Sequence, residues 1–200
     1  LATQARGARA IVVPARDYGH DLAAMLAAIA PDTRLVFVAN PNNPTATVLP
    51  ASAIASFVSS LPSGVVTLID EAYHDFAGAS VVELLDGHPN LVVLQTLSKI
   101  GLAALRLGIL LADERLVGEL NKVRLPYNVG SFSQVAAQIV LENLVFLEGQ
   151  IRGILEERDS LAAALGRLPG ITPFPSDANF ILLRTDRPSR AVHQALRWGA

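Results

Sequence analysis

The sequence predicts an α/β protein with a largely parallel β-sheet that has helices on both faces. Short apolar runs rich in Val, Ile and Leu alternate with runs of helical periodicity along the first half of the chain. The short runs lack a two-residue period, as expected for strands that are buried on both sides. Strand and helix alternating in this way are typical of parallel sheets joined by crossover helices.

The elements follow in chain order. We expect strands at residues 10–13, 35–39, 65–69 and 91–95. Apolar residues that recur every three to four positions predict helices at residues 21–30 and 50–61. After Asp113 the pattern becomes mostly helical. It predicts a helix at 114–123, nearly continuous helix over 131–168, a strand at 179–184 and a last helix that begins at Ser189.

Composition argues against several classes of function. The 16 basic and 18 acidic residues give a net charge of −2, with no basic cluster of the kind that binds nucleic acid. The absence of cysteine and the scattering of the four histidines argue against disulfides and a metal site. Apolar stretches are shorter than the roughly 20 residues of a membrane helix, and the first residues do not resemble a signal peptide. We therefore expect a cytoplasmic protein.

Three polar clusters follow three of the expected strands. They are ANPNNPTAT at residues 39–47, DEAYHDF at 70–76 and TLSK at 96–99. Taken singly, each has an ordinary explanation, because Asn-Pro forms turns, an aspartate caps helices and loop lysines are solvated. In sheets of this class, however, ligands bind beyond the carboxyl ends of the strands. Three such clusters at one edge favour a ligand site.

These side chains suit a cationic heteroaromatic cofactor with a phosphate tail. A carboxylate can keep a ring nitrogen protonated, while a tyrosine hydroxyl and an asparagine amide hold a ring oxygen. A lysine amine can form an imine with an aldehyde and then act as a general base. Serine and arginine can clamp a phosphate. Pyridoxal phosphate catalysis has these requirements.

Four ordered motifs carry a resemblance to a known family. NPNNPT, IDEAYHDF, TLSK with LRLG, and LPYNVGSFSQ resemble those of the fold type I pyridoxal-phosphate aminotransferases, and of the histidinol-phosphate aminotransferases in particular. The resemblance implies that Lys99 is the Schiff-base lysine and that Asp70 pairs with the pyridine nitrogen. It implies that Tyr73 and Asn43 hold the ring oxygen. For the phosphate, it implies Thr96, Ser98 and Arg106.

Two departures from the family pattern bear on this site. Ala46 stands where the family commonly has glycine, so the loop backbone differs if that position needs a positive φ angle. One residue fewer than usual separates Lys99 from Arg106, which leaves the geometry of Arg106 open. Of their neighbours, His74 is expected to be structural, and the sequence indicates no partner for Glu71.

The resemblance also implies an activity, namely amino-group exchange between L-glutamate and imidazole acetol phosphate in L-histidine biosynthesis. Small-molecule substrates and a homodimer, with Asn128 reaching the other subunit's site, are expected. Residues 1–150 would belong to the cofactor-binding large domain, ending in a long connecting helix, and residues 151–200 would start a smaller α+β domain. The chain would then be an excerpt of a longer protein. Three alternatives remain open: another class I/II aminotransferase, a phosphothreonine-type decarboxylase, and a non-catalytic small-molecule binding domain.

Overall fold

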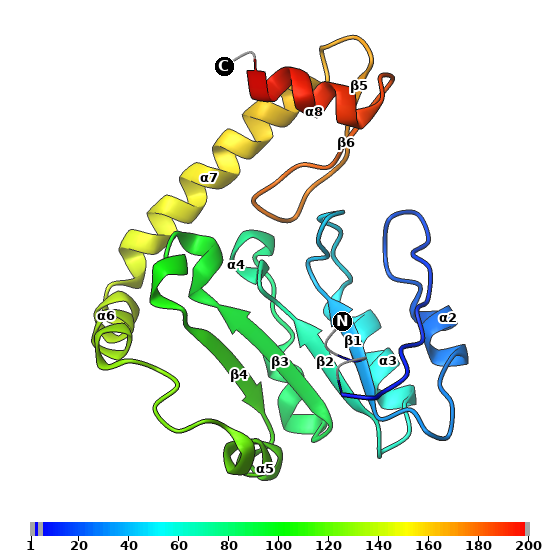
Figure 1. The fold of residues 1–200 in the computed structure, drawn as a ribbon, viewed down its shortest axis with the longest axis vertical. Coiled ribbons are helices and arrows are strands. Elements are labelled where there is room, and N and C mark those ends of the chain that lie inside the picture. The colour runs from blue at the N-terminus through cyan, green and yellow to red at the C-terminus, as the bar shows by residue number, and fades with distance from the viewer. Residues whose placement is uncertain (1–2, 4–5, 199–200) are drawn as a thin grey trace.

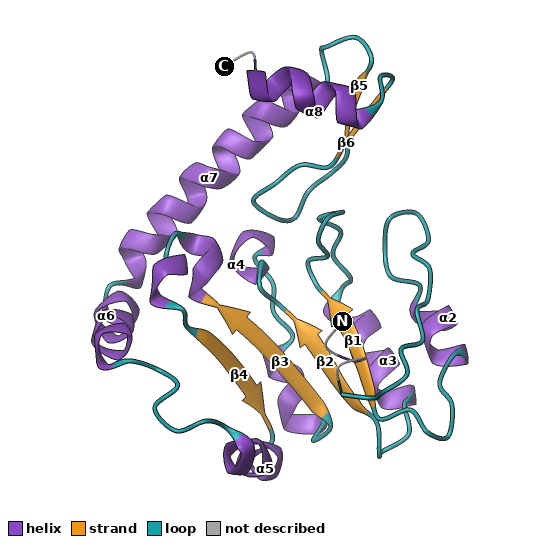
Figure 2. Cartoon of the chain, in the orientation of Figure 1, coloured by secondary structure: helices purple, strands orange, loops and turns teal. Residues whose placement is uncertain are grey.

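A four-stranded sheet forms the main body of the protein. The computed structural model describes residue 3 and residues 6–198 of the chain. The strands lie side by side in chain order, and they are β1 (Leu35–Ala39), β2 (Val66–Asp70), β3 (Leu91–Thr96) and β4 (Gly108–Ala112). The first three strands are parallel and β4 is antiparallel to β3 (Figure 2). The predicted α/β class with a mostly parallel sheet is therefore confirmed.

One face of this sheet holds the main hydrophobic core. The segments that pack there are α2 (Leu22–Ala27), α3 (Ala51–Ser60) and the 3-10 helix η1 (Val82–Gly87). Val38, Ile69 and Val93 of neighbouring strands are buried against α3. Right-handed crossovers between successive parallel strands bring the connecting helices to the same side. On the opposite face the β1 side chain of Phe37 is 58% exposed.

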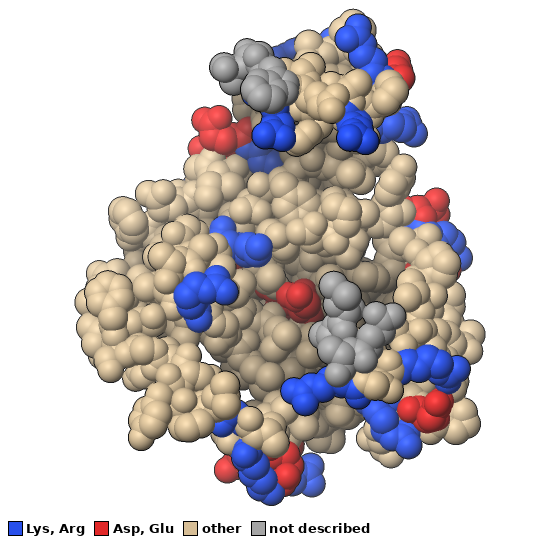
Figure 3. All heavy atoms as spheres, in the orientation of Figure 1, with Lys and Arg blue, Asp and Glu red and all other residues tan. Residues whose placement is uncertain are grey.

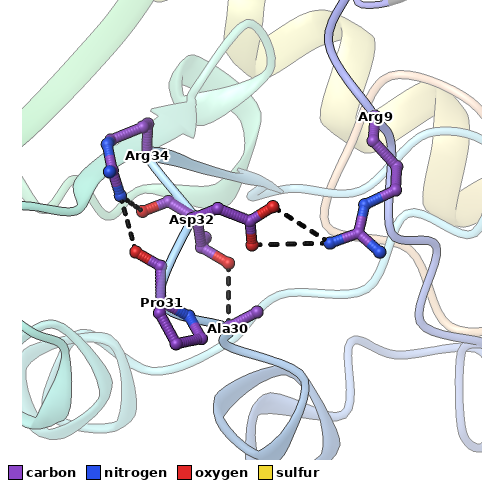
Figure 4. Close-up of polar contacts among 6 residues, drawn as sticks. Arg9, Ala30, Pro31, Asp32 and Arg34 are labelled. Carbon is purple, nitrogen blue, oxygen red and sulfur yellow. Dashed lines mark hydrogen bonds and ion pairs between the residues drawn. The ribbon is translucent and has the colours of Figure 1, made fainter.

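The predicted strand at residues 10–13 is wrong. This segment has no regular secondary structure and pairs with no strand among the described residues, and Val12 is exposed. Just before the segment, the Arg9 guanidinium donates to both carboxylate oxygens of Asp32, at 3.4 and 3.2 Å (Figure 4). Because both side chains are exposed, this ion pair contributes little stability. An apolar run with no partner strand has nowhere to place its backbone hydrogen bonds in a ladder.

Strand β4 was not predicted from the sequence. Its residues follow the TLSK cluster after a short loop that contains two 3-10 turns, η2 (Leu97–Ile100) and η3 (Ala103–Leu105). The alternation pattern predicts parallel strands joined by helices, whereas this connection is too short for a crossover helix. The chain therefore turns back and pairs β4 antiparallel, with Thr96 opposite Gly108.

Three helices follow the sheet, and their predicted positions are mostly confirmed. They are α5 (Glu114–Val123), α6 (Ser131–Glu142) and α7 (Leu144–Leu165). The predicted long helical stretch is interrupted at Asn143, whose φ of −125° is not helical. Helix α7 runs from the sheet body to a smaller unit (Figure 1). None of the described helices is long and apolar enough to cross a membrane.

The smaller unit contains a two-stranded antiparallel sheet and one helix. Its elements are β5 (Ile171–Pro173), β6 (Leu183–Thr185) and α8 (Ser189–Trp198). The strand predicted at residues 179–184 is wrong over most of its length, because only its last two residues belong to β6. Residues 176–180 instead form a loop whose backbone folds around the hydroxyl of Ser176. This loop points toward the sheet body.

Candidate active site

The carboxyl ends of β1, β2 and β3 meet at one edge of the sheet. The register pairs Ala39 with Asp70, and Asp70 with Leu94, so the three polar clusters begin side by side. A short helix, α4 (His74–Ala77), follows β2 at this edge. On the face shown in Figure 3, Lys and Arg side chains lie mainly around the rim, and acidic atoms are visible in the central hollow.

Tyr73 lies at the centre of the predicted residues. Its ring is buried, and its hydroxyl oxygen accepts a hydrogen bond of 2.9 Å from the side-chain amide of Asn43. The two residues are 30 positions apart in the sequence. Parallel pairing of β1 with β2 brings their loops together at the same edge. The structure therefore unites the two predicted partners of a ring oxygen.

Lys99 lies in η2, directly after β3, and is half-buried. Its ammonium nitrogen is 5.0 Å from the centroid of the Tyr73 ring, within the range of a cation–π interaction. Among the described residues this ammonium has no carboxylate partner and no hydrogen-bond acceptor. A primary amine that is partly withdrawn from water and not neutralised by an acid is available for bond formation.

Asp70 ends β2 and is half-buried. One carboxylate oxygen accepts from the backbone amide of Ala72 at 3.0 Å. The N-cap of α4 is Tyr73, not Asp70, so capping that helix does not explain the aspartate. Its second oxygen has no protein partner among the described residues and can accept a hydrogen bond from a ligand.

The Thr96 hydroxyl connects the three residues that are predicted to hold the phosphate, Thr96, Ser98 and Arg106. Thr96 Oγ1 lies 2.9 Å from the Ser98 hydroxyl and accepts from the Ser98 backbone amide at 3.1 Å. It also donates to the carbonyl of Leu107 at 3.1 Å, which brings the neighbouring Arg106 back to the end of β3. The guanidinium of Arg106 is exposed and makes no ion pair with a described residue. The shortened spacing therefore still delivers Arg106 to this corner.

Ala46 answers the question raised by the missing glycine. Its φ is +58°, so the loop does adopt the left-handed conformation that glycine accepts most easily. The residue is fully buried, and its amide donates to the Asn42 carbonyl at 2.7 Å. Alanine tolerates this conformation at a cost of about 1–2 kcal/mol. The loop therefore adopts a positive φ angle with alanine at this position.

Sequence reasoning missed the role of Glu71. Only 1% of this residue is exposed, and its carboxylate accepts from Ser80 Oγ at 2.6 Å, Val81 N at 2.7 Å and Gln95 Nε2 at 3.0 Å. These donors tie the end of β2 to the end of β3 and to the segment before η1. They are 9 to 24 residues away in sequence, so no local pattern could have indicated them.

His74 and Asp75 support the same corner without facing the candidate ligand residues directly. The His74 ring Nδ1 lies 3.0 Å from the Glu71 carbonyl, and Nε2 lies 3.6 Å from the Asp75 carboxylate. Burial raises the pKa of Asp75 above its usual value, and the nearby His74 opposes this shift. The structure thus gives His74 a local bonding role, as predicted.

A cavity of about 810 Å³ lies outside this edge, between α7 and the segment that leads into β6. Asn179 and Phe180 line part of its wall, together with Arg158 of α7. The predicted residues are absent from this wall, so volume alone does not locate the chemistry. Within the described part of the chain, no group of three or more His, Asp or Glu side chains is arranged to hold a metal ion.

Comparison with known proteins identifies the family. The sequence pattern of "Aminotransferase class I and II" matches residues 2–197. The chain belongs to this family. It is 47% identical, over 189 residues, to "Histidinol-phosphate aminotransferase 2" of Ralstonia nicotianae, covering 92% of this chain and 50% of that protein. It is 44% identical, over 188 residues, to "Aromatic amino acid aminotransferase" of a Mycobacterium species, covering 92% and 52%.

A solved structure agrees with this assignment to the class I and II aminotransferases. The histidinol-phosphate aminotransferase of Sinorhizobium meliloti, solved in complex with pyridoxal 5'-phosphate, superposes with a TM-score of 0.90 at 28% identity. The alignment covers 97% of this chain and 55% of that one. The chain therefore spans about half the length of the relatives it matches.

Pyridoxal phosphate is the cofactor of this aminotransferase family. The side chains at the sheet edge fit it chemically. Asp70 has a free carboxylate oxygen, Tyr73 and Asn43 form a joined pair of polar groups, and Lys99 has an unpaired amine. Hydroxyls and an unpaired guanidinium gather at the end of β3. Each chemical requirement of the cofactor therefore has a candidate in this chain.

Proposed function

We propose that the protein is a pyridoxal-phosphate-dependent aminotransferase that exchanges the amino group between L-glutamate and imidazole acetol phosphate in L-histidine biosynthesis. One observation carries the proposal. The unpaired Lys99 ammonium lies over the ring of Tyr73, whose hydroxyl is held by Asn43, at the edge where Asp70 ends β2. The names of relatives up to 47% identical support the choice of substrate.

In this proposal, Lys99 would be the residue that holds the cofactor covalently and that moves the proton at the substrate α-carbon. When bound, pyridoxal phosphate supplies an electron sink for the charge that develops at that carbon. Asp70 would hold a proton on the ring nitrogen, and Tyr73 and Asn43 would donate hydrogen bonds to the ring oxygen. Fixed groups of this kind stabilise developing charge without having to reorient.

The phosphate of the cofactor is assigned to the end of β3. Ser98 would donate a hydrogen bond from its hydroxyl and Arg106 would supply positive charge, while Thr96 shapes the turn that joins them. Arginine pairs well with phosphate because its two-pronged geometry matches two oxygens. This cluster would anchor the cofactor while Lys99 is free to act on the substrate.

Replacing Lys99 tests the proposal. In the purified protein loaded with pyridoxal phosphate, Lys99→Ala should abolish the visible absorption band of the lysine adduct and nearly all transamination. Lys122→Ala is the matched control, because Lys122 is an exposed lysine paired with Glu119. A Lys99→Ala variant that keeps the wild-type band and rate would overturn the assignment.

A second candidate substrate class is favoured by a specific observation. Relatives named as aromatic amino acid aminotransferases are 44% identical to this chain, close to the value for the histidinol-phosphate enzymes. Turnover should therefore be compared for histidinol phosphate, phenylalanine and phosphothreonine. We expect the highest kcat/KM with histidinol phosphate. A clear preference for phenylalanine would select the aromatic class, and one for phosphothreonine would contradict both.

The proposal includes a homodimer and a division into two domains. Residues 125–146 carry many exposed apolar side chains, as expected of a subunit interface, and Asn128 lies in this segment.

Residues 1–150 are proposed as part of the large domain and residues 151–200 as the start of the small one, with the boundary inside α7. The expected cytoplasmic location is kept as part of the proposal, and microscopy of a tagged protein tests it.

A further inference from the structure

A loop of the smaller unit contacts the candidate site directly. Residues 176–180, with the sequence SDANF, connect β5 to the segment that enters β6. Ala178 at the middle of the loop is completely buried, together with Ala46, Tyr73 and Phe76 of the sheet body. The tip of this loop therefore packs as part of the core beside the candidate site.

The loop is held in shape by its own polar contacts. The Ser176 hydroxyl lies within hydrogen-bonding distance of the Phe180 and Ala178 carbonyls, and accepts from the Ala178 amide at 3.2 Å. Arg158 of α7 donates to the Ala178 carbonyl at 3.1 Å, and its side chain is mostly buried. A loop fixed by α7 on one side can present a rigid surface on the other.

Three separate segments of the candidate site meet that surface. The Asp177 amide donates to the Ala46 carbonyl at 2.9 Å. The Asn179 side-chain amide donates to the Lys99 carbonyl at 3.4 Å, a long hydrogen bond. The Phe180 ring meets the Tyr73 ring edge to face, with centroids 5.1 Å apart and an interplanar angle of 79°. This arrangement is a favoured one for aromatic pairs.

Among the described residues, the exposed Asn43 is the hydrogen-bond partner of the Tyr73 hydroxyl, and the Lys99 ammonium lies over the Tyr73 ring. The packing of Phe180 therefore helps to fix the orientation of that ring. We propose that Phe180 is a positioning residue for Tyr73 and that Asn179 is one for Lys99, so that the loop of residues 176–180 completes the cofactor site from the smaller unit. This inference rests on the proposed function. It adds Phe180 and Asn179, which would affect the cofactor indirectly by positioning Tyr73 and Lys99.

The proposal predicts a spectroscopic effect as well as weaker binding. A hydroxyl that donates to the cofactor ring oxygen stabilises its anionic form and so lowers the pH at which the lysine adduct titrates. When the Phe180 ring is lost, the Tyr73 hydroxyl should be less well placed. The midpoint of the visible band should then move to higher pH, and the cofactor should dissociate more readily.

Phe180→Leu in the purified protein tests this, with Phe174→Leu as the matched control. Phe174 lies in the same connection, and its ring packs on Tyr18 without touching Tyr73 or Lys99. We expect about three- to tenfold weaker pyridoxal phosphate binding and a raised midpoint for Phe180→Leu, and no change in either for Phe174→Leu. Phe180→Tyr keeps an aromatic ring at this position and should retain the wild-type value of both quantities.

Asn179→Ala provides a second route if Phe180→Leu does not fold. It should raise the dissociation constant for the cofactor, whereas Asn121→Ala, which removes an exposed asparagine of α5, should not. Wild-type behaviour of both Phe180→Leu and Asn179→Ala, or equal effects of Phe180→Leu and Phe174→Leu, would overturn the inference. A wild-type protein that forms no coloured adduct would instead contradict the proposed function.

Discussion

Two of the motifs that define the family resemblance have opposite environments. In IDEAYHDF, residues 69–76, the side chains of Ile69, Glu71, Tyr73 and Phe76 are all buried. In LPYNVGSFSQ, residues 125–134, Leu125 and Phe132 are exposed and Tyr127 is 99% exposed. The first motif is held in place by contacts within this chain, whereas the second has little to hold it. Two motifs that both match the family can therefore differ in how many of their side chains are buried within this chain.

The exposed motif continues into a longer apolar surface. Val135 and Ile139 of α6, and Val145 and Phe146 at the start of α7, are also exposed. Monomeric proteins rarely expose large contiguous apolar patches, and those that exist mark interaction sites. This surface supports the proposal that residues 125–146 pack against a second copy of the chain.

The largest effect is expected at the buried motif, from Asp70→Asn. This change should leave much of the cofactor affinity, because the phosphate cluster at the end of β3 is untouched. The rate should fall by a factor on the order of 10² to 10³, since the fixed charge opposite the ring nitrogen is lost. Steady-state kinetics and cofactor titration measure the two quantities. Asp86→Asn, at an exposed position, is the control, and turnover near normal in Asp70→Asn would show that the carboxylate only shapes its own loop.

Glu71→Ala tests how much the stability of the buried motif depends on the hydrogen bonds of the Glu71 carboxylate. The change leaves Ser80, the Val81 amide and Gln95 without their acceptor. The Val81 amide is buried, and a buried donor without an acceptor is costly, so we expect the free energy of unfolding to fall by about 1–3 kcal/mol. Glu71→Gln keeps one acceptor oxygen and should lose less. Denaturant unfolding measures both.

The exposed carboxylate of Glu83 offers a control for that experiment, because Glu83→Ala removes a carboxylate of the same type from the surface. Equal stability of Glu71→Ala and Glu83→Ala would mean that the three hydrogen bonds contribute nothing. In that case the rigidity of the buried motif would have to come from the packing of Tyr73 and Phe76 alone.

For the exposed motif, Phe132→Ser should act on association and not on folding. We expect about tenfold weaker self-association, because exposed aromatic residues are frequent energetic centres of interfaces. Analytical ultracentrifugation over a range of concentrations measures it. Val12→Ser alters another exposed apolar side chain outside the patch and should have no effect. Unchanged association of Phe132→Ser would remove the main support for this interface.

Much of the site was predictable because its residues follow strands. Asp70 is the last residue of β2, Asn43 and Lys99 lie a few positions after β1 and β3, and parallel strands end at the same edge. A pattern of alternating strands and helices is therefore enough to bring them together. The contact between Asn43 and Tyr73 follows from this rule, even though 30 residues separate them.

The parts that could not be predicted depend on contacts without a sequence period. Glu71 finds its donors through the register of β2 with β3 and the fold of the next turn. The strand predicted at residues 179–184 begins too early, because Asn179 and Phe180 belong to a loop whose carbonyls are bound by Ser176 and Arg158. The apolar run at residues 10–13 pairs with no strand in the described part of the chain. Tertiary context decides each of these cases.

The smallest effect is expected next to the buried motif, at Asp75. Burial raises its pKa, so the folded state binds the proton more tightly than the unfolded state does. The stability from this group is therefore fully present below pH 3.8, the unfolded value, and is lost as the pH rises through the raised folded pKa.

Asp75→Asn cannot ionise and should melt on the order of 1 °C higher than wild type at pH 7, with the difference vanishing near pH 3. Calorimetry across this range measures it, with the exposed Asp86→Asn as control. A lower melting temperature for Asp75→Asn at pH 7 would show instead that the ion pair with His74 outweighs burial.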